Sequence, residues 1–461
     1  MGELTYAADA DAIRGRFVPA ATSDVRVRIE CDGAHWATVP AFPDPGTPGM
    51  FEFSCTLAPV SETTRSSVTA RAPGGMLLGS NDVRRQPLRN SHGLLASVVY
   101  ATDHHPFFAL PWLTFDGTKI TLSGMHLPPE GDPAELELEF GPGVSYDLRY
   151  GMRVPAFRTQ YWYWPNADLS GFILEIDLAA SERTSDPFHF RFLYPAPSRF
   201  GGGKRSIDMW LPRDLGSFRG FPTDSSQLTR VQTGSTSASS SMTGYHAFKT
   251  LEALFASTGI DPDSGPVVLD WGCGHGRVTC HFIDQWPLAK MYGTDIDAEN
   301  IAWCNEHLAP ERFVVAPLWP PCEFADGTFD GIFGISVVTH LTAEAQRAWL
   351  AELARILKPG GTALLTFSAD ASAAFTSYWR DAAWWSRWQE LAFNDEQIDT
   401  ALAGKISEPE YYRNTLQSTP GFVRECGRHF DVLSIEPAIF GGYQDCAILR
   451  KPLAASRLGE Q

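Results

Sequence analysis

A short apolar run, an acid and three regularly spaced glycines stand together in the second half of the chain. The apolar residues are Val267 to Leu269, and positions 277–286 after the glycines have helical periodicity. Glycine lacks a Cβ, so its backbone can approach a ligand closely, and a helix N-terminus offers unpaired N–H groups and the positive end of a dipole. A strand, a glycine turn and a helix in this order predict a nucleotide-binding site. The acid is Asp270 and the glycines are Gly272, Gly274 and Gly276.

The spacing of the glycines separates two classes of ligand. A dinucleotide site needs its third glycine three residues after the second, to hold pyrophosphate against the helix, but that position holds Arg277. Asp270, just before the turn, would repel a pyrophosphate and suits a ligand that carries an ammonium group. A turn of purely structural origin, with Asp270 only capping it, is the alternative interpretation.

A second strand, 290–297, also ends in an acid. Asp295 stands nineteen residues after Gly276, close to where a doubly wound fold places the carboxylate that binds a ribose. The segments that follow alternate between helix and strand, which predicts parallel βα units. They are a helix at 298–308, strands at 312–315 and 329–336, an amphipathic helix at 343–357 that ends at Lys358-Pro359-Gly360-Gly361, and strands at 362–367, 430–435 and 446–450.

This run, from LDWGCGHG through SVVTHL to LARILKPGG, resembles class I S-adenosylmethionine-dependent methyltransferases. The resemblance implies an α/β, doubly wound (Rossmann-like) domain that binds S-adenosylmethionine. It also implies that Asp295 accepts from both ribose hydroxyls, Ile296 packs on adenine and Ser336 lies beside the sulfonium. Tyr245, in the helix expected before the first strand, is a further candidate for contact with the cofactor. The residues expected around its methionine end are Asp270, Gly272, Cys273, Gly274 and Gly276.

Two departures from the family pattern narrow these expectations. The family often has an acid or amide after the third strand to bind the adenine amino group, whereas this chain has the apolar segment 315–321. The contacts of adenine are therefore left unassigned. The chain also lacks the Asn-Pro-Pro-Tyr signature of amino-methyltransferases after the fourth strand, which disfavours an exocyclic amine as the methyl acceptor.

Three residues are expected on the acceptor side. His340 follows the fourth strand, where a neutral imidazole near pH 7 can take a proton from a hydroxyl; the alternative is a helix-entry residue that binds backbone. The resemblance places the hairpin at 441–443 at the same edge of the sheet as the cofactor, so Tyr443 and Gln444 are candidates for contact with the acceptor. Four tryptophans, at 379, 384, 385 and 388, either pack a lid helix or form a substrate platform.

The closing sequence, 442–445 through 451–452, also resembles methyltransferases that accompany glycosyltransferases in bacterial surface-polysaccharide pathways. This narrower resemblance implies a role in polysaccharide biosynthesis, with an oxygen on a glycan or related small molecule as the methyl acceptor. It also implies a glycosyltransferase partner.

The N-terminal half has a different periodicity, because apolar and polar residues alternate there in several short segments such as 25–30 and 51–55. Alternation of this kind is typical of antiparallel strands with one buried face. We expect an Ig-like β-sandwich at 1–90, a second β-sandwich at 95–200, a linker or lid at 201–244 and the methyltransferase domain at 245–453. The aromatic run at 161–164 is interpreted as core, interface or ligand platform.

The composition limits the class of protein and its compartment. The chain has 461 residues, 44% hydrophobic and 20% charged, without an apolar stretch of membrane-spanning length or a secretory signal. Its net charge of −17 disfavours a nucleic-acid substrate. The eight cysteines show no metal-ligand spacing, so no metal is expected. We expect a cytoplasmic location, where thiols stay reduced. Cys31 and Cys55 could in principle meet, but they are interpreted as core residues.

Together these observations predict a methyltransferase that modifies an oxygen. A catalytically silent cofactor-binding scaffold is the main alternative, and an NAD(P)-dependent oxidoreductase is disfavoured by Arg277 and Asp270. Residues 1 to about 200 contain no paired acids, metal spacing or nucleophile constellation, so we expect them to hold a large acceptor. The alternative is that they mediate homo-oligomer or partner contacts.

Overall fold

The computed structural model describes the C-terminal region almost throughout and the N-terminal half in shorter pieces. The described residues are 3–7, 12–19, 25–44, 47–57, 64–72, 75–85, 107–115, 119–127, 137–140, 144–154, 157, 169–177, 188–195, 204–211, 237–376 and 393–453. The aromatic run at 161–164 and the four tryptophans at 379–388 lie outside these ranges. No helix in the described ranges has the length and apolar character needed to cross a membrane.

A seven-stranded sheet organises the C-terminal region, with the order β18-β17-β16-β19-β20-β24-β23. The first five of these strands are parallel, and β24 runs antiparallel to both β20 and β23. The predicted doubly wound, Rossmann-like fold with an antiparallel final hairpin is confirmed. Its strands are β16 (Val267–Trp271), β17 (Lys290–Asp295), β18 (Phe313–Val315), β19 (Phe329–Gly334), β20 (Leu357–Ser368), β23 (Asp431–Phe440) and β24 (Gln444–Arg450).

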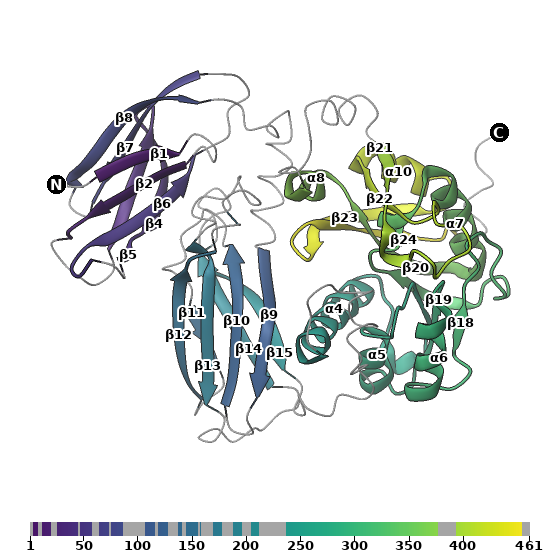
Figure 1. Cartoon of the computed structure of the whole chain (residues 1–461). Coiled ribbons are helices and arrows are strands. Elements are labelled where there is room, and N and C mark those ends of the chain that lie inside the picture. Colours follow the sequence, from purple (N-terminus) through teal and green to yellow (C-terminus); the bar gives the residue numbers. More distant parts are fainter. Residues whose placement is uncertain are drawn as a thin grey trace.

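Helices lie on both faces of this sheet (Figure 1). The side chain of Asp297 caps the first turn of α6 through Glu299 N, and Thr342 caps α7 in the same way through Ala345 N. A small hairpin, β21 (Phe393–Ile398) and β22 (Arg413–Gln417), follows β20 and α8. The helices are α4 (Ser237–Ser257), α5 (Thr279–Gln285), α6 (Ala298–His307), α7 (Ala343–Ile356), α8 (Asp370–Thr376) and α10 (Thr419–Cys426), with 3-10 turns η6 (Pro262–Ser264), η7 (Val338–His340) and η9 (Thr400–Leu402).

The alternation of side chains along the strands divides them between two cores. Val268 and Leu364 face the core that α4 and α5 cover, whereas their neighbours Leu269 and Leu365 face the core that α7 and α10 cover. Because successive side chains of a strand point to opposite faces, one apolar run can serve both layers. This explains why the sequence of β16 is continuously apolar up to Asp270.

The Lys-Pro-Gly-Gly segment differs in part from its prediction. It ends α7 as expected, but it belongs to the start of β20 instead of to a connecting turn. The cause is pairing across the chain: Gly360 N donates to Lys451 O, and Lys451 N donates to Gly361 O. Lys358 Nζ also lies 2.8 Å from both carboxylate oxygens of Asp330 on β19.

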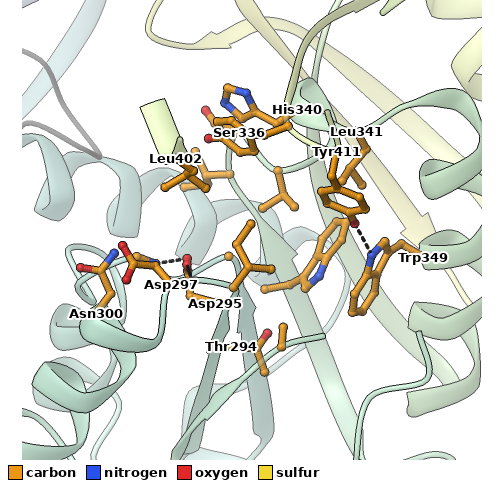
Figure 2. A pocket seen from close by; sticks show the side chains of 18 residues that line it. Thr294, Asp295, Asp297, Asn300, Ser336, His340, Leu341, Trp349, Leu402 and Tyr411 are labelled. Atoms are coloured by element: carbon orange, nitrogen blue, oxygen red, sulfur yellow. Dashed lines mark hydrogen bonds between the residues drawn. The ribbon is translucent and has the colours of Figure 1, made fainter. Parts of the chain in front are cut away.

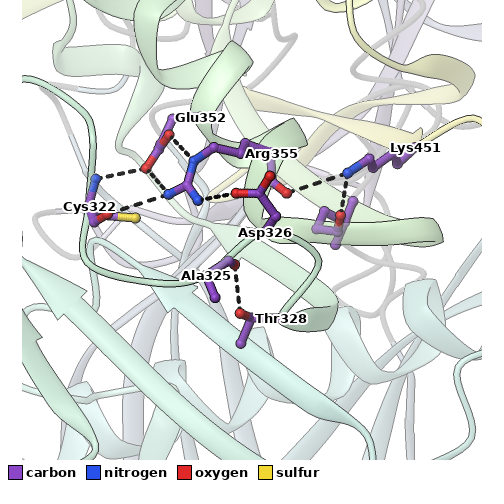
Figure 3. Close-up of polar contacts among 8 residues, drawn as sticks. Cys322, Ala325, Asp326, Thr328, Glu352, Arg355 and Lys451 are labelled. Atoms are coloured by element: carbon purple, nitrogen blue, oxygen red, sulfur yellow. Dashed lines mark hydrogen bonds and ion pairs between the residues drawn. The ribbon is translucent and has the colours of Figure 1, made fainter.

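A network of charged side chains fixes the end of α7 (Figure 3). Arg355 donates to Glu352 and Asp326, each at 2.7 Å, and so ties the helix to the loop before β19. Glu352 also accepts from Cys322 N at 2.7 Å. Lys451 Nζ donates to Leu357 O, where a cation also complements the helix C-terminus. These contacts hold the loop that leads away from β18.

The first part of the N-terminal half contains two four-stranded sheets, β1-β2-β6-β5 and β4-β3-β7-β8. Buried side chains from both sheets form one cluster that includes Cys55, and Cys31 packs against it. Both cysteines are free thiols. A sandwich requires such a shared core, but the predicted sandwich and its Ig-like assignment both stay predictions. The strands are β1 (Glu3–Ala7), β2 (Ala12–Phe17), β3 (Arg26–Cys31), β4 (Ala34–Pro40), β5 (Phe42–Pro43), β6 (Phe51–Thr56), β7 (Thr64–Arg71) and β8 (Leu77–Arg85).

The next strands form the sheets β12-β13-β10-β9 and β11-β14-β15, whose buried residues also share a cluster. Residues 204–211, which lie in the segment predicted as a linker or lid, form β15 and pair with β14 along its whole length. Alternation of Ile207, Met209 and Leu211 is the signal for this strand. Helix α4 begins at Ser237, earlier than expected, and contacts β9 and β15. The bounds are β9 (Phe107–Phe115), β10 (Lys119–Leu127), β11 (Glu137–Glu139), β12 (Ser145–Met152), β13 (Gly171–Asp177), β14 (Phe188–Pro195) and β15 (Lys204–Leu211).

Candidate active site

A pocket opens at the carboxyl ends of β16, β17 and β19, and the first turn of α6 and η7 complete this part of its lining. Residues 402, 411 and 412, from the segment between β21 and β22, line the pocket as well. Figure 2 shows Asp295, Asp297 and Asn300 on one side and the hydrogen-bonded pair Tyr411 and Trp349 on the other. Ligands of doubly wound sheets bind at this edge, where the strand order reverses.

The glycine turn is shaped by contacts within the protein. Gly272 has φ +80°, and a Cβ there would lie 2.2 Å from a methyl of Val337. Gly276 has φ +77°, and a Cβ there would lie 2.3 Å from a methyl of Leu308. The left-handed backbone and the close packing therefore both require glycine at these positions. Gly272 and Gly274 also line the pocket, whereas Gly276 packs behind them.

Asp295 joins the end of β17 to the glycine turn. Its Oδ2 accepts from Gly274 N and its Oδ1 accepts from Asp297 N, both at 2.8 Å. Burial raises the pKa of Asp295 to about 6, while these backbone donors act in the opposite direction. Each carboxylate oxygen keeps a further lone-pair position, and the residue lines the pocket. Its predicted place at the cofactor site therefore has a geometric basis.

Asp270 has a different environment, although it ends the neighbouring strand. Its side chain is buried, accepts from Thr279 Oγ1 at 2.5 Å and is not part of the pocket lining. Burial raises the pKa of this carboxyl to about 7. This geometry favours the alternative interpretation, in which Asp270 caps the turn and the first residues of α5.

Among the remaining predicted cofactor residues, some line the pocket and others do not. Ile296 and Ser336 line the pocket. Cys273 instead packs into a small core with residues of α6 and β18. Tyr245 is buried in α4 with its ring against His281, at a centroid distance of 5.0 Å, and does not line the pocket.

Ser336 is held in an unusual backbone conformation by a closed set of hydrogen bonds. Its φ is +59°, which costs energy for a residue with a Cβ. Its N–H donates to Thr366 Oγ1 at 2.7 Å, and its hydroxyl donates to Gln444 Oε1 at 2.9 Å. Thr366 Oγ1 also donates to Gln444 Oε1, at 3.0 Å. Ser336 Oγ has thus given away its only hydrogen, and its lone pairs alone are available to a positively polarised ligand group.

The two residues predicted to touch the acceptor lie behind the pocket in the structure. Gln444 is buried and supports Ser336, so its contribution to the pocket is indirect. Tyr443 stacks on Phe375 with ring centroids 4.7 Å apart, and it does not line the pocket. The hairpin between β23 and β24 reaches the correct edge of the sheet, but these side chains pack into the fold.

His340 lines the pocket and binds backbone at the same time. Its Nδ1 lies 2.8 Å from Arg413 O and 3.7 Å from Asp399 Oδ2, and its ring stacks on Tyr412 at a centroid distance of 4.1 Å. Burial lowers the pKa of His340, so the ring is neutral at pH 7. A neutral ring that donates from Nδ1 to the Arg413 carbonyl carries its lone pair on Nε2. The backbone contact agrees with one interpretation of His340 from the sequence, and its role as a base stays a prediction.

Sequence reasoning missed the aromatic part of the lining. Trp349 Nε1 donates to Tyr411 Oη at 2.9 Å and to Leu318 O at 3.1 Å, and its ring packs 5.4 Å from that of Trp271. Trp349 comes from α7 and Tyr411 from the segment before β22. No local motif joins them, so only the fold brings these rings together.

Comparison with known proteins agrees with this geometry. Residues 268–361 match the family model described as a methyltransferase domain, a span that contains the glycine turn, Asp295 and His340. Over 101 residues the chain is 34% identical to trans-aconitate 2-methyltransferase of Azoarcus sp., covering 22% of this chain and 38% of that protein. Over 114 residues it is 35% identical to the human thiol S-methyltransferase TMT1B, covering 22% and 43%.

The chain thus spans about two fifths of the length of these curated relatives. A solved structure of a SAM-dependent methyltransferase from Methanosarcina mazei is 16% identical over 43% of this chain and 97% of that chain, with a TM-score of 0.32. The match to a methyltransferase domain is confined to residues 268–361, and the hairpin β21–β22 lies beyond them.

Proposed function

We propose that this protein is an S-adenosylmethionine-dependent methyltransferase that transfers a methyl group to an oxygen of an uncharged acceptor, a glycan or a related small molecule. One observation carries the proposal: Asp295 lines a pocket at the strand ends while both of its oxygens bind the backbone of the turn and of α6. The carboxylate is thereby preorganised to accept from ribose hydroxyls.

The charge of the pocket supports this cofactor over a dinucleotide. Asp295 and Asp297 are the charged side chains among the described lining residues, and no Lys or Arg is among them. A lining of this sign attracts the sulfonium and ammonium groups of S-adenosylmethionine and repels a pyrophosphate. Ser336 Oγ, with lone pairs only, adds a further acceptor for positively polarised hydrogen atoms.

The cofactor, when bound, supplies a methyl group that is already activated on a sulfonium. The chain then has to orient the acceptor and exclude water, which provides much of the rate. The Gly272–Gly274 turn and Asp295 would hold the cofactor, and Leu402 and Tyr412 would cover the acceptor. His340 Nε2 would take the proton of an attacking hydroxyl, because Nδ1 is already engaged with Arg413 O.

The acceptor is assigned from the chemistry of the described lining. A carboxylate or phosphate acceptor needs a cationic partner, and the described lining offers none. The curated relatives are named for trans-aconitate and for thiols, two different acceptors, so similarity alone selects neither. A neutral hydroxyl with His340 as base fits the pocket best. The link to polysaccharide biosynthesis, the glycosyltransferase partner and the cytoplasmic location stay predictions.

Labelled cofactor tests both parts of the proposal. Purified protein is incubated with methyl-labelled S-adenosylmethionine and fractionated cell extract, and the label is followed into glycan, lipid-linked, small-molecule, protein and nucleic-acid fractions. We expect label in a glycan or neutral small-molecule fraction. Label in protein or nucleic acid would overturn the acceptor class, and no transfer into any fraction would favour the silent scaffold.

A further inference from the structure

Asn300 has a buried amide whose position packing does not explain. It stands in the first turn of α6, is 3% exposed and lines the pocket. Its Oδ1 is buried and accepts no hydrogen bond from any residue that the structure describes. A buried acceptor left without a partner costs about 1–3 kcal/mol, and an apolar side chain of the same size would avoid that cost. An orphan acceptor that faces a pocket therefore indicates a ligand group that donates to it.

The surroundings of Asn300 identify the kind of donor. Asp295 lies five residues before it, and Asp297, the cap of α6, lies between them. Figure 2 shows the three side chains together on one side of the pocket. Each oxygen of Asp295 already accepts one backbone N–H. A vicinal diol placed at Asp295 thus has hydroxyl hydrogens to donate within the part of the pocket that Asn300 lines.

We propose that Asn300 is a second ribose-binding residue, whose Oδ1 accepts a hydrogen bond from one hydroxyl of the cofactor ribose while Asp295 accepts from the other. The inference rests on the proposed function, since it presumes that an adenosyl cofactor occupies the pocket. It adds a specificity determinant for the sugar: a 2′- or 3′-deoxyribose would leave the amide oxygen without its donor.

Equilibrium binding measures this role without any need for turnover. S-adenosylhomocysteine and its 2′-deoxy and 3′-deoxy analogues are titrated into the 461-residue chain and into Asn300→Leu, which keeps the volume and removes the acceptor. Asn300→Ala is the second variant, in case the first does not fold. Glu306→Gln, on the exposed face of the same helix, is the matched control, and thermal unfolding checks that all four proteins are folded.

We expect Asn300→Leu to bind S-adenosylhomocysteine about tenfold or more weakly. We also expect it to bind one of the two deoxy analogues as well as the parent chain does, while Glu306→Gln binds all three ligands like the parent. Affinity for S-adenosylhomocysteine within twofold of the parent would overturn the inference. An equal loss for all three ligands would overturn it too, because the effect would then be structural. If the parent chain itself does not bind S-adenosylhomocysteine, the proposed function fails as well.

Discussion

The two sides of the pocket differ in how far apart in the sequence their residues lie. The side with Asp295 and Asn300 comes from one continuous segment, the glycine turn to the first turn of α6. The rest of the lining combines η7, α7 and the segment between β21 and β22, and this segment lies outside the methyltransferase-domain match. A ligand site formed within one βαβ unit can be recognised from a local sequence motif, whereas a site formed between distant segments has no such motif.

Two acids at the ends of adjacent strands also differ, in the direction of their side chains. Asp295 on β17 lines the pocket and binds the backbone of the turn. Asp270 on β16 turns toward Thr279 and is buried beneath the turn. Sequence spacing treats both as cofactor ligands, and the direction of the side chain separates them.

Replacement of Asp295 should have the largest effect on the cofactor side. Asp295→Ala removes the carboxylate that would accept one ribose hydroxyl in a charge-assisted hydrogen bond of about 1.5–3 kcal/mol, and with it the acceptor of the Gly274 and Asp297 N–H groups. We expect affinity for S-adenosylhomocysteine to fall by roughly 10²–10⁴-fold in a calorimetric titration. Asp263→Ala, at an exposed position, is the control. Near-native affinity in Asp295→Ala would place the ribose site elsewhere and would remove the basis for the contrast between the two sides of the pocket.

Replacement of His340 should lower turnover and leave cofactor affinity nearly unchanged. His340→Ala removes the base, which typically contributes about 10²–10⁴-fold to turnover. We expect turnover to fall within that range while affinity for S-adenosylhomocysteine changes by less than about twofold. Normal turnover would show that His340 only binds the Arg413 carbonyl and that another group, or the acceptor itself, manages the proton.

The sequence predicts the sheet and the position of several pocket-lining residues for a physical reason. The period of apolar residues marks β16, β17 and β19, and the glycine spacing marks the turn at their ends, so Asp295, Ile296 and Ser336 are found at the pocket. Tyr443 and Gln444 are at the expected edge but do not line the pocket, because a hairpin places residues and does not decide side-chain direction.

Other residues that line the pocket are marked neither by apolar periodicity nor by glycine spacing. Tyr411 and Trp349 meet only after α7 and the segment between β21 and β22 have packed together. Asn300 has helical spacing like any first-turn residue, and its unpartnered oxygen is visible only in the folded chain. The strand at 204–211 was predictable from its alternation, and the glycines and prolines around it obscured that pattern.

Replacement of Asp399 should change the pH dependence of the acceptor side without abolishing activity. The neutral form of His340 is the base, so the rate falls when the pH drops below the pKa of this ring. The Asp399 carboxylate, 3.7 Å from Nδ1, acts to raise that pKa against the lowering by burial. In Asp399→Asn the pKa should fall further, so the acid limb of kcat/KM should move to lower pH.

The amide in Asp399→Asn can still cap η9 through Ala401 N, as the carboxylate does. We expect less than about a tenfold change in rate at pH 7, since the ring is neutral there in both proteins. Glu410→Gln, exposed on the same segment, is the control for a change in surface charge. An acid limb that stays in place, or moves to higher pH, would show that Asp399 does not act on the base.

The smallest effect on the pocket is expected from Asp270. Its folded-state pKa of about 7 lies above the ordinary value of 3.8, so its contribution to stability is complete below about pH 4 and is lost as the pH rises to about 7. Asp270→Asn keeps an oxygen for Thr279 and should flatten this part of the profile of unfolding free energy against pH. Cofactor affinity should change by less than about twofold. A large loss of affinity would make Asp270 a cofactor ligand after all.

A calorimetric titration of the 461-residue chain with S-adenosylhomocysteine, alongside one with NAD⁺, tests the central claim most directly. The geometry of Asp295, the glycine turn and a pocket lining without Lys or Arg in its described part predicts one binding site for S-adenosylhomocysteine and none for NAD⁺. Binding of NAD⁺ in its place, or no binding of S-adenosylhomocysteine, would contradict the claim.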